Sequence, residues 1–143
     1  MKYHFTVHKE GKGYWAECIE LEGCQTQGDS MAQLHTNMEE ALNLYLDEPP
    51  HSKTLFGLPK RVAKGKSIVE VPVEPKIAFA FLLRYLRLKH KLTQREVAQR
   101  LGFKSIFGYQ KLEASKTANP EFATIVKLKK VFPELSLDDV VGF

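Results

Sequence analysis

The 143-residue sequence contains only two cysteines, Cys18 and Cys24, and no long apolar run. Two cysteines are too few for a disulfide framework, and no other zinc ligands lie near them at the required spacing. We therefore expect both to be small core residues. No stretch reaches the roughly 18 apolar residues of a transmembrane helix. The first ten residues alternate instead of forming an apolar signal core, so we expect no secretory signal. These absences favour a reduced, cytoplasmic compartment without a membrane partner.

The sequence also lacks the residue clusters of common enzyme chemistry. An RNase H-like enzyme needs several carboxylates that converge on metal ions. The expected strands and helix offer Glu17, Glu39, Glu40 and Glu70, with no strand-borne aspartate. His4, His8 and Cys18 are potential metal ligands without a closer ligand cluster. We therefore expect no enzyme, no cofactor and no metal, and a residual nuclease remains a rival hypothesis.

Positive charge is concentrated in the second half of the chain. Residues 1–72 hold 8 Lys and Arg against 10 Asp and Glu, a net charge of −2, whereas residues 73–143 hold 13 against 7, a net charge of +6. Proteins that contact phosphates show such a basic half, because affinity for DNA comes largely from counterion release. A solvated basic surface is the alternative.

The first 73 residues show the alternation of apolar and polar residues that is typical of half-buried strands. The expected strands are Lys2–His8, Tyr14–Leu21, Cys24–Gln27 and Ser67–Val73. Before the fourth strand, Ser30 is expected to cap a helix that ends at Pro49 and carries one apolar stripe. Residues 51–66 are predicted to form a long loop. The predicted order is β-β-β-α-β, with the helix covering one face of the sheet.

Pro72 and Pro75 mark the boundary between two expected domains, residues 1–73 and 74–143. The second domain is expected to begin with a helix from about Pro75 to His90. Its segment Ile77–Leu83 is apolar on nearly every face, which is more than one small domain can bury. This surplus predicts contact with the first domain or with a second copy of the chain.

Two more helices are expected near the end of the chain. Asn119 is expected to cap one of them, with Pro120 at its first position. The expected core face of that helix is Phe122, Ile125, Val126, Leu128 and Phe132. Ser136 is expected to start a short last helix that ends near Val140.

The stretch from Leu92 to Glu113 predicts two helices joined by a tight turn. Thr93 and Glu96 have the spacing of a capping box. Gly102 is the expected stop of the first helix, because glycine adopts left-handed backbone without a Cβ penalty. Ser105 is expected to cap the second helix. The gap of about three or four residues is the length used by helix-turn-helix units.

This stretch resembles the helix-turn-helix of the phage-repressor-like (XRE) family over roughly residues 77–140. The matching residues are Thr93-Gln94, Val97-Ala98, Leu101-Gly102, Ser105, Tyr109, Leu112-Glu113, Lys116-Thr117, Pro120 and Phe122. The resemblance implies double-stranded operator DNA as a partner, bound by dimers on half-sites about one helical turn apart. The alternative is a helical hairpin that binds nothing.

The resemblance also implies a set of contacts. The second helix would place base-facing residues in the major groove, namely Ser105, Ile106, Phe107, Gln110 and Lys111. Lys111 suits guanine and Gln110 suits adenine. Ile106 and Phe107 are apolar where polar residues are usual. One interpretation is that they contact thymine methyl groups; the alternatives are weak readout of the DNA sequence or an interface. The implied phosphate contacts are Gln94, Arg95, Lys104 and Lys116. Arg87 and Glu113 match a structural ion pair of the family.

The first domain resembles HicB antitoxins from about Lys2 to Val73. The matching residues are Gly13-Tyr14-x-Ala16, Gly23-Cys24-x-Thr26-Gln27-Gly28-Asp29-Ser30, Asn37 and Glu40-Ala41-Leu42. The resemblance implies a trimmed RNase H-like fold and a HicA-like partner, a basic mRNA-cleaving toxin. An acidic set is available to meet it: Glu10, Glu17, Glu20, Glu22, Asp29, Glu39 and Glu40. The chain departs from the family by Glu22-Gly23 in place of Pro-Gly.

Together these patterns predict an α+β protein, with an N-terminal β-β-β-α-β domain followed by an all-α five-helix helix-turn-helix domain. The predicted function is a HicB-like antitoxin that inhibits its toxin and represses its own operon, as a homodimer or a higher homo-oligomer. The alternative is a stand-alone repressor whose first domain dimerises or senses a ligand.

Overall fold

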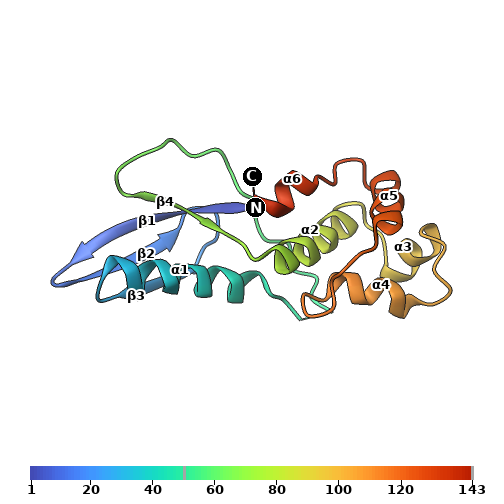
Figure 1. The fold of residues 1–143 in the computed structure, drawn as a ribbon, viewed down its shortest axis with the longest axis horizontal. Coiled ribbons are helices and arrows are strands. Elements are labelled where there is room, and N and C mark those ends of the chain that lie inside the picture. The colour runs from blue at the N-terminus through green and yellow to red at the C-terminus, as the bar shows by residue number, and fades with distance from the viewer. Residues whose placement is uncertain (50, 143) are drawn as a thin grey trace.

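The computed structural model describes residues 1–49 and 51–142 and shows an elongated, mixed α+β molecule (Figure 1). The first part consists of β1 (Lys2–Glu10), β2 (Gly13–Cys18), β3 (Gln25–Gly28), α1 (Met31–Leu46) and β4 (Ile68–Pro72). The helices that follow are α2 (Pro75–Lys89), α3 (Gln94–Arg100), α4 (Ile106–Glu113), α5 (Phe122–Val131) and α6 (Leu137–Val141). The predicted β-β-β-α-β order is therefore confirmed. None of the described helices is long and apolar enough to cross a membrane.

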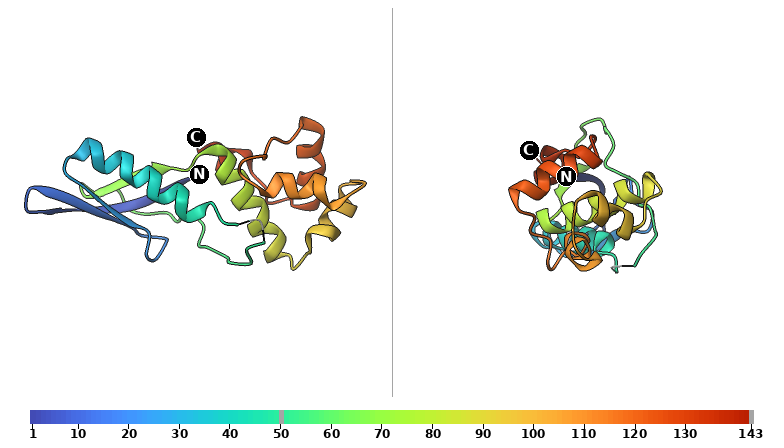
Figure 2. Two further views of the ribbon diagram at one scale, coloured as in Figure 1. Left: turned by 90° about the horizontal axis from the view of Figure 1, so that it is seen from below. Right: turned by 90° about the vertical axis from the view of Figure 1, so that its right-hand side faces the viewer.

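The four strands form one antiparallel sheet in the order β3-β2-β1-β4. Phe5 lies opposite Cys18 on one side and Val69 on the other, so alternate residues of three strands share one face. The apolar stripe of α1 packs on this face, with Leu34 and Met38 fully buried (Figure 2). The alternation in the sequence therefore identified the face that the helix covers.

The helix α1 lies unusually close to the strand that precedes it. A Cβ atom on Gly28 would lie 2.7 Å from the backbone nitrogen of Leu34, so only glycine fits at this position. The predicted cap is also present, since the backbone N–H of Gln33 donates to Oγ of Ser30 at 3.1 Å. The run that ends in Gly28-Asp29-Ser30 thus has a local structural reason.

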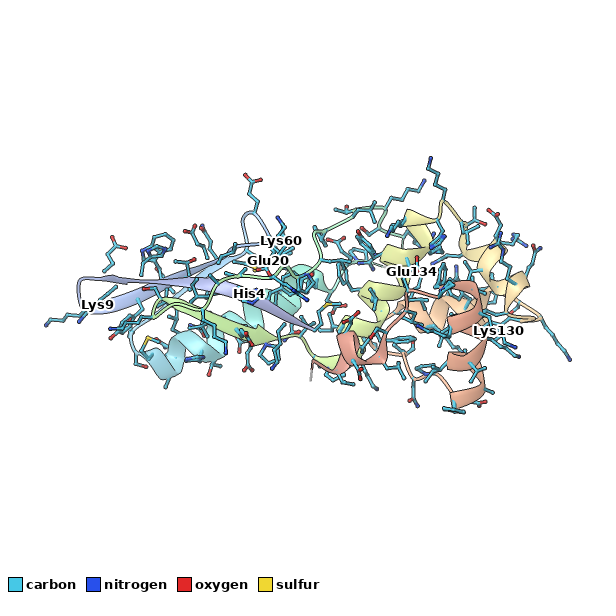
Figure 3. All side chains as sticks on the ribbon, turned by 90° about the horizontal axis from the view of Figure 1, so that it is seen from above. His4, Lys9, Glu20, Lys60, Lys130 and Glu134 are labelled. Atoms are coloured by element: carbon cyan, nitrogen blue, oxygen red, sulfur yellow. The ribbon has the colours of Figure 1, made fainter. Side chains whose placement is uncertain are left out.

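The strand β2 ends at Cys18, so the prediction that it extends to Leu21 was wrong. The Glu20 carboxylate turns inward, where it accepts a hydrogen bond from the backbone N–H of His4 at 2.9 Å and lies 2.8 Å from Nδ1 of the same residue. It also accepts from the backbone N–H of Lys60 at 3.2 Å, and Figure 3 shows the three residues together. Because these bonds need a bend after Cys18, the chain leaves the regular strand there.

Two further predictions for this part, on the cysteines and on the loop, are confirmed. Cys18 and Cys24 are free, buried thiols. Residues 51–66 form a loop without helix or strand. Besides the contact with Lys60, the loop is held where the Tyr3 hydroxyl donates to the carbonyl of Gly57 at 2.8 Å.

The helix α2 lies between the sheet and the helices α3, α4 and α5 (Figure 1). Every residue from Ile77 to Leu83 is buried, and α2 packs against α1, α4 and α6. The ring of Phe56, from the loop before β4, lies 6.4 Å from that of Phe81. The apolar surplus of this helix is therefore covered within the chain, and it gives no support for a second copy.

The helix α5 differs from its prediction in start and orientation. Asn119 and Pro120 are outside it, and Glu121, with extended backbone, occupies the N-cap. Leu128 is fully buried, but Phe122 and Val126 are 79% and 42% exposed. At 100° per residue, Phe122 and Val126 share a face that points away from Leu128. Apolar type alone did not distinguish these two faces.

Candidate nucleic-acid interface

The helix α3 begins with the predicted capping box. The backbone N–H of Glu96 donates to Oγ1 of Thr93 at 3.1 Å, and the backbone N–H of Thr93 donates to Oε1 of Glu96 at 3.2 Å. These reciprocal bonds satisfy two backbone donors that a helix start leaves without partners. The buried residues Val97 and Ala98 then orient the helix on the core.

A tight turn joins α3 to α4, as predicted. Gly102 has a φ of +75°, in the left-handed region that favours glycine. Ser105 occupies the N-cap of α4, but its side chain forms no capping hydrogen bond within the described part of the chain. Tyr109 and Leu112 point inward as predicted, and burial raises the pKa of the Tyr109 phenol. The face of α4 opposite these two residues is left toward solvent.

A buried polar network fixes α3 and α4 on α2. Nε of Arg87 lies 2.9 Å and 3.0 Å from the two carboxylate oxygens of Glu113, and its Nη1 donates to the carbonyl of Leu92 at 3.1 Å. Gln94 Nε2 donates to the same carboxylate at 2.9 Å, and Gln110 Nε2 donates to Oε1 of Gln94 at 3.1 Å. The expected ion pair is confirmed, and it continues outward to Gln110, a candidate base contact.

The structure brings most of the candidate DNA contacts to the surface of this unit. The exposed ones are Arg95, Lys104, Ser105, Phe107, Lys111 and Lys116, and the half-buried ones are Gln94, Ile106 and Gln110. Phe107 is 69% exposed, so its ring is open to solvent in the first turn of α4. The side chain of Gln94 is engaged by Glu113 and Gln110, a role that the sequence did not indicate.

A groove of about 620 Å³ lies beside the first turns of α3 and α4. Its lining combines Gln94, Arg95 and Ile106 with residues from outside α3 and α4, namely His51, Ser52 and Lys53 of the loop and Lys91 after α2. His51, Ser52, Lys53 and Lys91 were not predicted from the sequence as DNA contacts. A signal was present, because residues 51–66 contain five Lys and Arg and no Asp or Glu.

The structure does not gather the acidic set proposed for a basic partner into one patch. The Glu20 side chain is fully buried against His4, so its inclusion was wrong. Glu17 lies on the sheet face opposite α1, because its partner Thr6 alternates with buried Phe5 and half-buried Val7. Glu39 and Glu40 are exposed on α1, which covers the other face. The carboxylates considered for nuclease chemistry are separated in the same way.

The histidines of the first strand have other partners than a metal ligand set. His4 pairs with Glu20, whereas the His8 ring stacks on Trp15 with the ring centres 4.1 Å apart. Cys18 projects from the sheet face packed under α1, opposite both histidines. The possible set of His4, His8 and Cys18 is therefore split between two faces of the sheet.

Two comparisons bear on this interface and on the whole chain. Residues 83–140 match the family described as Helix-turn-helix, the segment that contains α3 and α4. The match indicates a DNA-binding regulator, in agreement with the capped helices and the tight turn.

The chain also resembles UPF0150 proteins. It is 32% identical over 80 residues to one from Helicobacter pylori, an alignment that covers 56% of this chain and 100% of the relative. It is 40% identical over 48 residues to one from Synechocystis, covering 32% of this chain and 61% of the relative. Because the Helicobacter pylori protein is matched along its whole length, this chain belongs to the UPF0150 family.

Proposed function

We propose that this chain is a HicB-like antitoxin that represses its own operon through α3 and α4 and inhibits a HicA-like, mRNA-cleaving toxin through residues 1–73. The helix-turn-helix match supports the DNA-binding half. The β-β-β-α-β order and the HicB-like residues around Gly28 support the other half. We place the boundary between the two functional parts at residues 73 and 74.

The single observation that carries the DNA-binding proposal is the network from Arg87 to Gln110. One hydrogen of the Gln110 amide is donated to Gln94, which orients the amide at the surface of α4. The second N–H of the amide is then available to donate to N7 of adenine. The amide oxygen is available to accept from the N6 amino group of the same base. Lys111, on the next position of α4, suits O6 and N7 of guanine.

The other candidate residues divide into base and backbone contacts. Ser105 and Phe107 lie at the exposed start of α4 with half-buried Ile106, and the two apolar side chains suit thymine methyl groups. The exposed cations, together with the first turn of α3 at Gln94, suit phosphates of the same duplex. These cations are Arg95, Lys104 and Lys116.

We propose that two copies bind together, through an apolar patch on α5 and α6. The patch consists of Phe122, Val126, Leu137 and Val141, which are 42–79% exposed. The last turn of α5 is basic and the first turn of α6 is acidic. Val126 and Leu137 line one groove with Lys130 and Asp138, so the patch is bordered by charges of both signs, which suits a self-complementary two-fold contact. The patch therefore suits a second copy of this chain.

The test has two arms, one for each partner. The chain is co-expressed with the product of the adjacent open reading frame, and RNA cleavage by that product is measured with and without this chain. Binding to the DNA upstream of the gene is measured in parallel. We expect a stable complex that abolishes cleavage, and specific DNA binding.

The outcomes separate the proposal from its alternative. DNA binding without any complex would leave a stand-alone repressor whose first part dimerises or senses a ligand. A complex without DNA binding would remove the autoregulatory role. Divalent-metal-dependent RNA cleavage by the pure chain would revive the nuclease hypothesis.

A further inference from the structure

We propose that the segment 51–53 and Lys91, which lie outside α3 and α4, hold the phosphate backbone of the duplex that these two helices read. The inference rests on the proposed operator binding and extends its surface into the loop before β4. The juxtaposition that carries it is the groove that these residues share with Arg95 and Ile106. Figure 2 shows the chain after α1 passing beside the end of α2.

The charge of this groove suits a polyanion. His51, Lys53, Lys91 and Arg95 line it, and among the described lining residues none is Asp or Glu. Arg87 also lines it, but its guanidinium is paired with Glu113. By contrast, a groove of about 420 Å³ on another part of the surface includes a glutamate and two aspartates. The cationic groove borders the first turns of α3 and α4, where the duplex is proposed to bind.

Anchors on both sides hold the segment in place. Before it, Oγ of Ser115 donates to Oδ1 of Asp47 at 2.6 Å, which joins the end of α1 to the chain after α4. After it, the ring of Phe56 lies 4.8 Å from that of Tyr45. At its end, the backbone N–H of Thr54 donates to Oγ of Ser52 at 3.2 Å. A segment that is already ordered loses little conformational entropy when it binds.

Lys91 provides an independent observation. Its φ is +57°, and it is the only described non-glycine residue with positive φ. Glycine adopts this conformation without the Cβ penalty that lysine bears and is the usual residue just past a helix end. Lys91 nevertheless occupies this position and lines the groove. A phosphate contact explains a residue that backbone geometry alone disfavours.

The proposal predicts how binding responds to salt. Each lysine that neutralises one phosphate contributes about 0.9 to the slope of log affinity against log salt, whatever the base sequence. Removing one such contact therefore weakens binding about fivefold at 150 mM salt. The loss should be equal on operator DNA and on a random duplex, because phosphates carry no sequence information.

The experiment measures the affinity of the full chain for its own upstream DNA and for a random duplex by fluorescence anisotropy at several salt concentrations. We expect Lys53→Ala to weaken both about fivefold and to reduce the slope by about 0.9. Lys64→Ala is the matched control, because Lys64 belongs to the same loop but lines a different groove, with His4 and Glu70. It should bind like the wild type.

A second variant distinguishes contact from structure. Lys91→Gly should raise the melting temperature by about 2–4 °C, through relief of the left-handed lysine, while it weakens binding about fivefold. Wild-type affinity and slope in both Lys53→Ala and Lys91→Gly, with Arg95→Ala weakened, would overturn the extended surface and leave operator binding intact. If the wild type binds neither duplex, both proposals fall. Binding to the random duplex alone would overturn operator recognition. The variants would then still test whether the groove contacts DNA phosphates.

Discussion

Oε2 of Glu113 accepts a hydrogen bond from Nε2 of Gln94 at 2.9 Å, and the same carboxylate is paired with Arg87. One buried carboxylate at the end of α4 therefore holds the end of α2 and the start of α3. Gln110 receives its orientation through this arrangement, since it donates to Gln94. Stability and base recognition should consequently depend on the same group.

Glu113→Gln should destabilise the fold strongly. It leaves the Arg87 guanidinium, whose side chain is 9% exposed, without a counter-charge. Breaking a buried pair from one side typically costs about 3–5 kcal/mol of the free energy of unfolding. Urea unfolding at pH 7 measures the loss. Glu70→Gln is the control, because its carboxylate is 51% exposed and 4.0 Å from Lys2, and it should change stability by less than about 1 kcal/mol. Equal effects of the two variants would contradict the role of the network.

The two N-caps of the helix-turn-helix should separate stability from DNA affinity. Thr93→Ala removes the bond from the backbone N–H of Glu96 to the Thr93 hydroxyl, keeps the bond from the Thr93 backbone N–H to Glu96, and should cost about 1 kcal/mol of unfolding free energy. Ser105→Ala should change stability by less than about 0.5 kcal/mol, because its side chain makes no capping bond within the described residues, but it should weaken operator binding. Thermal unfolding and DNA titration of both variants measure the contrast. The reverse pattern would exclude Ser105 from the interface.

Tyr3 should make the fold sensitive to alkaline pH. Burial raises the pKa of its phenol above the ordinary value of about 10. The folded state therefore favours the neutral form, so the stability from this group is complete below pH 10 and decreases as pH rises above it. Tyr3→Phe should cost about 1 kcal/mol at pH 7, through the lost bond to Gly57, and should flatten the decline above pH 10. Urea unfolding from pH 8 to 11 tests this, and an equal decline in both proteins would refute it.

Local chemistry made much of this structure predictable. The capping box at Thr93 and the left-handed Gly102 depend on residues within one turn of each other, and both are present. Apolar alternation likewise identified the sheet face under α1, because a strand has only two faces. These features need no knowledge of distant parts of the chain.

Features decided by distant partners were not predictable in this way. Glu20 is an ordinary acidic residue in sequence and becomes buried because His4 and Lys60 surround its carboxylate. Phe122 has the apolar character of a core residue, but α5 packs on the core through Leu128 and leaves Phe122 in solvent. The loop before β4 reaches the helix-turn-helix only because α1 directs it there. In each case the outcome depends on tertiary contacts between residues far apart in the chain.

Val126→Glu should dissociate the proposed dimer. It places a carboxylate on the exposed face that Val126 shares with Phe122, where a second copy would have to bury it. Sedimentation velocity should show a shift toward monomers, with unfolding free energy changed by less than about 0.5 kcal/mol because the site is exposed. Lys127→Glu, also exposed on α5, is the charge control. A wild type that is monomeric at high concentration would contradict the dimer.

Base readout and backbone contact should be separable on neighbouring helices. Gln110→Ala removes the proposed adenine contact and should reduce discrimination at one base pair by about 1–3 kcal/mol, with the salt slope unchanged. Arg95→Ala removes a proposed phosphate contact at the exposed start of α3, and it should weaken every sequence equally and lower the slope by about 0.9. Titration of a set of single-base operator variants at several salt concentrations gives both quantities. Since Gln110 is oriented by Gln94, the variant Gln94→Ala should also lose discrimination while it keeps the charge of the surface. Full discrimination in Gln94→Ala would show that the network serves the fold alone.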